Sequence, residues 1–458
     1  MAMGRREREP QQTLWVATDQ IRSSGHVFYD KLNALLDAHA FDDFVEEQCE
    51  PFYAEKMGRP SLEPGVYFRM HLVGYFEGLD SERGIAWRCS DSLSLRAFLG
   101  YTLKKNPPDH STVSRTRRLI DLETHEKVFT FVLKILGENG LIDGKTIGVD
   151  ASTQEANAAM RSIVRRDTGE SYEQYLEGLA KDSGIETPTR EDLAKLDKKR
   201  KNKASNKDWE HPHDPDAKIT KMKDGRTHLA HKVEHAIDLE GEGAVLSVNL
   251  YGADQGDTST LADTIVSTTE QLRELADDPN TADKLHDDWM GEVVADKGYH
   301  SNDTMVTMEE MEVRSYTSEP DRGKRDWEGK EAERDAVYRN RRRIRGNRGK
   351  RLLRTRGELV ERPFNHYLDD GRMRRTHLRR QENIQKRLLV HVAGFNLGIL
   401  MRRWLGAGTP KGLAALRAAV LALHAALRRL QTPMIASFML WSRPPAPSPP
   451  MPTPKMAA

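Results

Sequence analysis

The amino-acid sequence predicts an α/β protein in which a mixed sheet is flanked by helices, with an all-helical domain before it and more helices after it. Apolar residues recur at helical spacing from Phe28 to about Leu122. Short β-branched runs separated by turns then dominate from residue 145 to residue 317. Helical patterns return from about Asn383 onward, and a length of 458 residues suffices for two or three domains.

Charge is distributed unevenly along the chain, although the formal net charge is only +1. Acidic residues gather before about Asp288, and basic residues gather between Arg339 and Arg387. Such segregation predicts a polyanion-binding segment within a nearly neutral protein.

The composition favours a soluble protein of the reducing cytosol. The only cysteines, Cys49 and Cys89, give neither a disulfide framework nor a cysteine-based zinc site. The N-terminus lacks an apolar signal segment. The most apolar stretches, 388–405 and 413–430, are too short and too charged to span a bilayer, so we expect no membrane partner.

The first structured region is expected at residues 14–125, after a polar, disordered segment at 1–13. Within it, the stretch Ser111–Arg118 has a polar start and a basic face. Hydroxyls and arginines of this kind contact DNA phosphates or base edges, which makes Arg115 and Arg117 candidate DNA-binding residues. A solvated helix in an all-α domain explains the same pattern equally well.

The second region is expected at residues 140–405. Its strand patterns lie at 145–153, 228–238, 244–251, 293–295 and 314–317, and 239–243 forms a hairpin turn. We expect Asp257 to cap a helix that runs to about Leu275. The polar segment 154–216, with its lysine-rich run at 198–203, is interpreted as an exposed, partly mobile insertion or, alternatively, as a DNA-contacting arm.

Helices are predicted at 352–366, 383–404 and 410–430. The last of these belongs to a C-terminal helical segment at 406–441. The tail at 442–458 is rich in proline and alanine and is expected to be disordered. The apolar sets in the last two helices are expected to form core or subunit contacts.

Two acidic residues stand where short apolar strands end. Asp150 closes a β-branched run, and Asp296 closes Val293–Ala295. A lone strand-end aspartate is usually a cap, a turn former or an ion-pair partner. Two of them together suggest a divalent cation such as Mg²⁺, which binds through one or two carboxylates plus substrate phosphates. Lys297 would either contact a phosphate backbone or complete the turn.

A two-metal phosphoryl-transfer site usually takes a third acid from another element. Glu361 lies in a basic neighbourhood, as such a ligand should if DNA approaches it. Glu358 lies about one helical turn earlier on the same face and is the alternative. Pro363 predicts that the helix bends or ends near Glu361.

The basic run from Arg339 to Arg356 contains no acidic residue. A solvated helix normally mixes charges of both signs, so this run would repel itself unless an anion neutralised it. DNA backbone binding is therefore the stronger hypothesis. The candidate phosphate contacts are Arg341, Arg342, Arg343, Arg345, Lys350, Arg354, Arg374 and Arg375, together with Lys297, Arg115 and Arg117.

Three histidines, His228, His231 and His235, suggest a zinc site at first sight. On a strand, His231 and His235 would share a face with apolar neighbours, and no cysteine is near. A half-buried strand explains them better than a metal site.

The acidic residues also carry a family resemblance. Asp150 in IGVDAST, Asp296 in VVADKGY and Glu361 in RGELVERPF resemble, in that order, the three acids of the DDE transposases of bacterial insertion sequences. The resemblance extends over about Phe28–Arg403 and includes the basic C-terminal part. It implies a ribonuclease-H-like catalytic domain, Mg²⁺ or Mn²⁺ as cofactor, and cleavage and transfer of DNA strands.

Some features depart from that family pattern. Some relatives have an arginine four residues before the glutamate and a lysine seven after it, where this chain has Gly357 and Leu368. Arg354 stands four residues before Glu358, which keeps Glu358 open as the third acid. The context VERPF favours Glu361.

The resemblance predicts a cytoplasmic DNA transposase, nucleoid-associated when bound, that binds terminal inverted repeats. The element ends and the target DNA would be its partners. Because two ends must be brought together, a homodimer is expected in the active complex. The alternatives are an inactive DNA-binding descendant of such an enzyme and a stand-alone metal-dependent nuclease.

Overall fold

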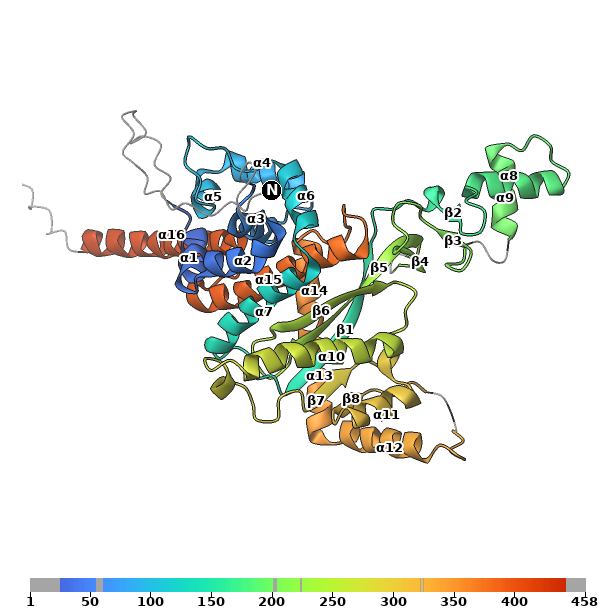
Figure 1. The fold of residues 1–458 in the computed structure, drawn as a ribbon. Coiled ribbons are helices and arrows are strands. Elements are labelled where there is room, and N and C mark those ends of the chain that lie inside the picture. Colours follow the sequence, from blue (N-terminus) through green and yellow to red (C-terminus); the bar gives the residue numbers. More distant parts are fainter. Residues whose placement is uncertain are drawn as a thin grey trace, which may run out of the picture. The chain divides into compact units, whose positions relative to one another are not determined.

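The computed structural model describes residues 25–54, 61–200, 204–222, 225–321, 323 and 325–441 (Figure 1). The predictions for residues 1–13 and 442–458, and for part of the lysine-rich run at 201–203, lie outside these residues. The chain divides into two compact units, residues 1–410 and 411–458.

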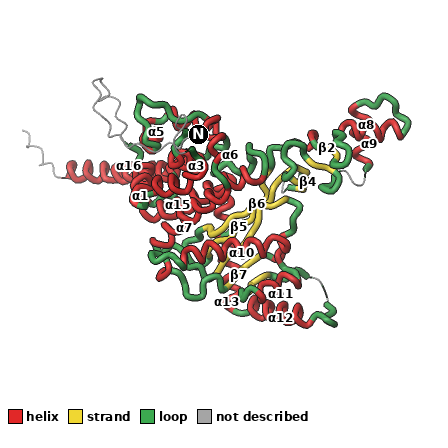
Figure 2. The backbone as a smooth tube through the Cα atoms, in the orientation of Figure 1, coloured by secondary structure: helices red, strands yellow, loops and turns green. Residues whose placement is uncertain are grey.

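The first unit begins with helices, as predicted (Figure 2). Asp109 and Asp121 cap two of them, because each carboxylate accepts a hydrogen bond from the backbone N–H three residues later. A central helix, α3, starts at Pro64 and is buried on every side. The helices are α1 (Val27–Ala38), α2 (Phe41–Cys49), α3 (Pro64–Phe76), α4 (Glu82–Asp91), α5 (Leu93–Phe98), α6 (His110–Leu119) and α7 (Leu122–Glu138).

A six-stranded mixed sheet follows, which confirms the predicted fold class. Its strands are β1 (Thr146–Glu155), β4 (Lys218–Lys221), β5 (Thr227–Asp238), β6 (Val245–Gly252), β7 (Glu292–Ala295) and β8 (Arg314–Thr317). Strands β4 and β6 pair with β5, which runs antiparallel to β1. Strands β1, β7 and β8 are parallel neighbours. All strands predicted in this region are present within two residues of the expected bounds.

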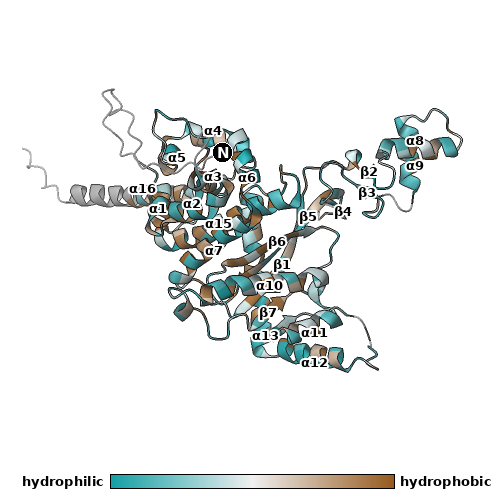
Figure 3. Ribbon diagram, viewed as in Figure 1, coloured by the Kyte–Doolittle hydropathy of each residue, from teal (hydrophilic) through white to brown (hydrophobic). Residues whose placement is uncertain are grey.

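Helices cover both faces of the sheet. On one face, α10 (Asp257–Ala276) packs on β5 and β6, and its Thr268 hydroxyl bonds to that of Ser247 at 2.7 Å. On the other face, α13 (Asn347–Leu359) packs on β7 and β8. Apolar residues concentrate along the strands between these helices (Figure 3). Alternating side chains therefore divide each central strand into an α10 face and an α13 face.

Side-chain amides bond to the backbone of two edge strands of the sheet, β6 and β8. At the β6 edge, Asn396 of α15 (Gln381–Leu405) exchanges two hydrogen bonds with the backbone of Val245, at 2.8 and 3.0 Å. At the β8 edge, Asn340 of α12 (Glu331–Arg345) does the same with Thr317. These contacts satisfy backbone groups that would otherwise offer a template for another strand.

The insertion after β1 is more ordered than predicted. It contains β2 (Val164–Arg165), β3 (Trp209–Glu210), α8 (Tyr172–Asp182) and α9 (Arg190–Lys199). Ser171 and Thr189 open the two helices with capping boxes. Small cores form around Trp209 and around Leu176. The high polarity of the segment hid these short amphipathic patterns.

The remaining elements are α11 (Asn302–Glu310), α14 (Glu361–Phe364), a π-helical turn (Asn365–Asp370) and the 3-10 turns Glu50–Phe52, Met160–Ser162, Ala282–Lys284 and η5 (Lys297–Tyr299). Two sequence expectations need correction. Gly256, not Asp257, is the N-cap of α10, and Asp257 instead pairs with Lys232. The helix expected at 352–366 begins at Asn347 and is interrupted at Val360.

The second unit contains most of α16 (Pro410–Trp441). By length and composition alone, the stretch Gln381–Leu427 is apolar enough to cross a membrane, contrary to the expectation from sequence. A single stretch of this kind is weak evidence for a membrane span. Within it, α15 is buried from Ile384 to Met401 in the core of the first unit, whereas only 11% of the apolar window is buried.

Candidate active site

The two strand-end aspartates lie on neighbouring strands. In the parallel pair of β1 and β7, Gly148 lies opposite Val294. Asp150 stands two residues beyond Gly148 and Asp296 two residues beyond Val294, so both follow the last paired residues of neighbouring strands. Asp150 faces α13, because its carboxylate contacts Arg356 of that helix.

Of the two aspartates, Asp150 has the less exposed side chain. One carboxylate oxygen accepts a hydrogen bond from the Ala151 N–H at 2.8 Å, and the other lies 3.0 Å from the Arg356 guanidinium of α13. Burial raises the pKa of Asp150 to about 6, against the opposing effect of Arg356. The negative charges of Glu361 and Asp296 raise this pKa further, so both carboxylates lie within electrostatic range of Asp150.

Asp296 is exposed, and its side chain has no hydrogen-bond or ion-pair partner among the residues that the structure describes. It stands at the N-cap of η5, the turn that follows β7. There it lines a surface pocket of about 580 Å³ with Lys297, Gly298, Glu319, Pro320 and Asp321. A cation or a phosphate could therefore approach Asp296 directly.

Glu361 begins α14, immediately after the interruption at Val360, and it is exposed. His235 of β5, which pairs with Asp150 across the sheet, holds this interruption in place. Burial lowers the pKa of His235 to about 3, so the ring is neutral. Its Nε2–H donates to the Val360 carbonyl at 3.1 Å, its Nδ1 accepts from the Tyr367 hydroxyl at 2.9 Å, and the ring stacks on Phe364.

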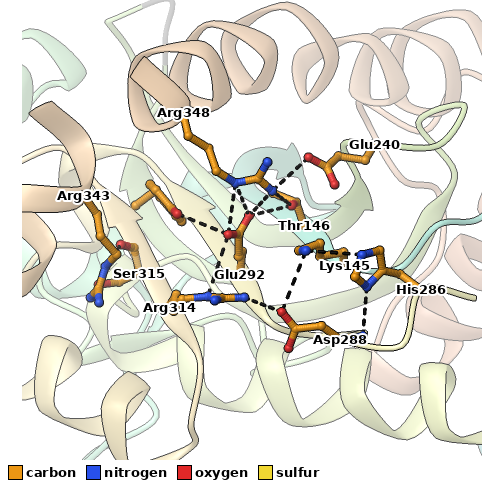
Figure 4. A network of polar contacts seen from close by, with 11 residues as sticks. Lys145, Thr146, Glu240, His286, Asp288, Glu292, Arg314, Ser315, Arg343 and Arg348 are labelled. Atoms are coloured by element: carbon orange, nitrogen blue, oxygen red, sulfur yellow. Dashed lines mark hydrogen bonds and ion pairs between the residues drawn. The ribbon is translucent and has the colours of Figure 1, made fainter. Parts of the chain in front are cut away.

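The start of α13 is fastened at the opposite end of the same strands (Figure 4). Arg348 donates to both Glu292 carboxylate oxygens, at 3.1 Å from Nε, and its Nη2 lies 3.0 Å from Glu240. Glu292 also accepts from Thr146 at 2.9 Å and from Tyr316 at 3.2 Å. We call the contacts of Arg348 with Glu292 and Glu240 the Glu292 clamp. Together with Arg356, this clamp aligns α13 along β1 and directs Glu361 toward the aspartates.

The carboxylates suit a hard divalent cation, because Mg²⁺ can be held by one or two carboxylates plus phosphate oxygens. Within the described parts of the chain, however, no three His, Cys, Asp or Glu side chains lie close enough to hold a metal by themselves. The Arg356 guanidinium supplies positive charge beside Asp150 instead. Asp150, Asp296 and Glu361 therefore have suitable donor atoms for such an ion, but in this structure they are not gathered closely enough to hold one by themselves.

Acidic residues elsewhere in the protein neutralise part of the basic run at 339–356. The expectation that only an external anion would relieve the repulsion within this run is therefore wrong in part. Arg339 pairs with Glu309, and Arg341 makes two hydrogen bonds to Glu319. Arg343 bonds to the Ser315 carbonyl. The acids that neutralise this run come from other elements, which the local sequence could not reveal. Within this run, the exposed cations that have no partner among the described residues are Arg342, Arg345, Lys350, Arg351 and Arg354.

The other predicted DNA-binding residues also fall into two groups, those that are exposed and those that pair with residues of the protein itself. Arg115 and Lys297 are exposed. Arg117 is buried and its Nε lies 2.8 Å from Glu82, so it is not available to DNA in this structure. Arg374 bonds to Asp369 and to the Ser152 hydroxyl of β1, and the exposed Arg375 lies 3.7 Å from Glu155.

Sequence reasoning did not single out Arg356, His235 or the Glu292 clamp. Arg356 could have been noticed as a basic residue five positions before Glu361, on a helix expected to approach Asp150. The sequence pattern favours a half-buried strand over a metal site for His235 and indicates no further role. Its role depends on contacts with Val360 and Tyr367, more than 100 residues away along the chain.

Two protein families match the chain by sequence. Residues 16–119 match a family described as a transposase domain (DUF772), and residues 206–397 match a family described as a transposase DDE domain. The second match includes Asp296 and Glu361, whereas Asp150 lies before it. No curated protein and no solved structure matches the chain.

Proposed function

Because this chain belongs to the DDE-type transposases of insertion sequences, we propose that it binds the terminal inverted repeats of its element and catalyses metal-dependent strand cleavage and transfer. The proposal is supported by the location of Asp150 and Asp296 after the paired residues of two parallel strands and by the electrostatic effect of Asp296 on Asp150. A third carboxylate, Glu361, lies within electrostatic range of Asp150.

Asp150, Asp296 and Glu361 would hold Mg²⁺ or Mn²⁺. When bound, such ions activate water and then a 3′-hydroxyl as nucleophiles, and they stabilise the leaving oxygen. Glu358 remains the alternative third acid, but the electrostatic effect of Glu361 on Asp150 favours Glu361.

The protein's own residues would position the reacting groups and neutralise charge. Arg356 holds Asp150 and supplies a positive charge beside it. His235 fixes the helix interruption from which Glu361 projects. The exposed pocket beside Asp296 leaves room for a DNA phosphate.

The exposed cations of α12 and α13 would grip the DNA backbone, with Arg342, Arg345, Lys350 and Arg354 as the main contacts. Arg375 and Lys297 would add contacts nearer the carboxylates, and Arg115 would contribute from the N-terminal helices. Since two element ends must be paired, the active complex would be a homodimer, bound to DNA in the cytoplasm.

The direct test is cleavage and joining of labelled DNA carrying the terminal repeats of the element that encodes this chain, with Mg²⁺. We expect the parent protein to cut and join, and Asp296→Asn to do neither. Asp263→Asn changes another exposed aspartate, in the middle of α10, and should behave as the parent.

The other outcomes identify the rival functions. Equal activity of Asp296→Asn and the parent would make Asp296 structural. Cutting without joining of pre-cut ends would indicate a stand-alone nuclease. Binding of the ends without any cutting by the parent would indicate an inactive DNA-binding descendant.

A further inference from the structure

The position of Asp296 depends on its backbone, because its side chain has no partner within the described residues. The turn that carries it is short. Within it, the Tyr299 N–H donates to the Asp296 carbonyl at 3.1 Å. Whatever fixes Tyr299 therefore also fixes the Asp296 backbone from which the carboxylate projects.

The Tyr299 side chain passes to the α10 face of the sheet and is buried. Its hydroxyl donates to the Glu234 carboxylate at 3.0 Å. Glu234, in the middle of β5, has no solvent exposure and also accepts from Thr260 at 2.7 Å and Thr264 at 2.6 Å. The Lys232 ammonium lies 3.0 Å from the same carboxylate. Four donors thus compensate the cost of burying this charge.

A second connection reaches the same turn. Lys232 also pairs with Asp257 at 2.8 Å, at the start of α10. Asp257 in turn lies against Gly298, where an added Cβ would come within 2.6 Å of the Asp257 carboxylate. The turn is therefore packed directly on this network, with no space for a side chain between them.

We propose that Glu234 is a positioning residue for the metal ligand Asp296, acting through the Tyr299 hydroxyl. This inference rests on the proposed function, because it assumes that Asp296 holds a divalent cation. Burial and the nearby acids raise the pKa of Tyr299 well above its ordinary value, so the hydroxyl keeps its proton and remains a donor. A metal ligand held by such an outer contact is already in place when the cation arrives, which increases affinity.

The network offers a matched pair of substitutions. Tyr299→Phe removes only the hydroxyl that joins Glu234 to the Asp296 turn. Tyr251→Phe removes a hydroxyl from the same network, where Tyr251 lies 3.1 Å from Thr264, but Tyr251 belongs to β6 and not to that turn. Any difference between the two variants therefore reports on the turn.

The experiment is a Mn²⁺ titration of the full-length protein without DNA, followed by electron paramagnetic resonance of free Mn²⁺. We expect Tyr299→Phe to weaken Mn²⁺ binding by about tenfold and Tyr251→Phe to leave it unchanged. Cleavage by Tyr299→Phe should recover at high Mn²⁺, and its affinity for DNA ends should equal that of the parent. Glu234→Gln keeps an acceptor for Tyr299 and should retain more Mn²⁺ affinity than Tyr299→Phe.

Each outcome bears on the proposal in a defined way. If Tyr299→Phe lowers the melting temperature but binds Mn²⁺ like the parent, the network is structural only and the inference is wrong. An equal loss of affinity in Tyr251→Phe would also overturn it. If Asp296→Asn binds Mn²⁺ as tightly as the parent, the proposed metal site fails and this inference fails with it.

Discussion

The two ends of strands β1 and β7 use acidic residues in opposite ways. At the N-terminal end, the Glu292 carboxylate is buried and accepts hydrogen bonds from Arg348, Thr146 and Tyr316 (Figure 4). These donors hold its pKa below the ordinary value, against the effect of burial. At the C-terminal end, Asp150 has a raised pKa and Asp296 has no side-chain partner in the described chain.

Under the proposed function, this contrast separates a carboxylate that stabilises the fold from carboxylates that are available to a metal ion. Both ends lie under the same helix, α13, so the difference comes from the number of donors at each end and not from the surrounding architecture. Charges left under-compensated cost stability, and they persist where function needs them.

The largest expected effect is the loss of DNA cleavage when the third acid near the C-terminal end of the strands is replaced. Glu361→Gln should lower cleavage of element ends by about 1000-fold, because a ligand to the catalytic ions would be lost. Glu358→Gln, one helical turn away, should stay within about threefold of the parent. The reverse order in a single-turnover cleavage assay would identify Glu358 as the third acid.

At the N-terminal end, Glu292→Gln should lower the free energy of unfolding by about 3 kcal/mol, because the half-buried Arg348 would lose the buried carboxylate that is its charged partner. Urea denaturation measures this. The control is Glu240→Gln, which removes the more exposed partner of Arg348 and should cost less than about 1 kcal/mol. A Glu292→Gln protein as stable as the parent would contradict the assigned role of the clamp.

The two ends should also differ in their dependence on pH. The pKa of Asp150 is raised to about 6 in the folded protein, above its value of about 3.9 in an unfolded chain. Its ionised form therefore costs stability, fully above pH 6, and the cost disappears as pH falls toward 4. Metal-free Asp150→Asn should be more stable than the parent by about 1 kcal/mol at pH 8 and equal to it near pH 4.

The ionised carboxylate of Glu292 affects stability in the opposite direction to that of Asp150. Its lowered pKa contributes stability above the pKa of an unfolded glutamate, and this contribution is lost as pH falls through the folded value. Thermal melts of both variants across this pH range separate the two effects. If Asp150→Asn were less stable than the parent at pH 8, the ion pair with Arg356 would outweigh the cost of burial.

The smallest expected effect concerns the exposed cations. Arg354→Ala should weaken DNA binding about threefold at moderate salt and make the slope of log K against log salt shallower by about 0.9. Arg339→Ala is the matched control, because Arg339 is already paired with Glu309 at 2.7 Å. Equal slopes for both variants would exclude Arg354 from the interface.

The sequence predicted the sheet and its acids because their signals are local. A β-branched run that ends in aspartate is visible at Asp150 and at Asp296, and alternation within β5 and β6 gave those strands almost to the residue. The interruption at Val360 was expected from Pro363.

The contacts that distinguish the two ends of the strands were not predictable in this way. Arg356 meets Asp150, and Arg348 meets Glu292, only after strands and helix are assembled. Likewise, nothing near Tyr299 in the sequence indicates that its hydroxyl reaches Glu234. The partners of the arginines between 339 and 348 are equally distant in sequence, which is why that run looked unneutralised.

The most direct test of the central contrast is Mn²⁺ binding by Asp296→Asn and Glu292→Gln, measured side by side by isothermal titration calorimetry. Each substitution removes one negative charge: Glu292 is the first residue of β7, and Asp296 directly follows its last residue. We predict that Asp296→Asn loses Mn²⁺ binding while keeping the stability of the parent, and that folded Glu292→Gln binds Mn²⁺ like the parent. Equal Mn²⁺ affinities of the two variants would contradict the division between a structural and a functional end.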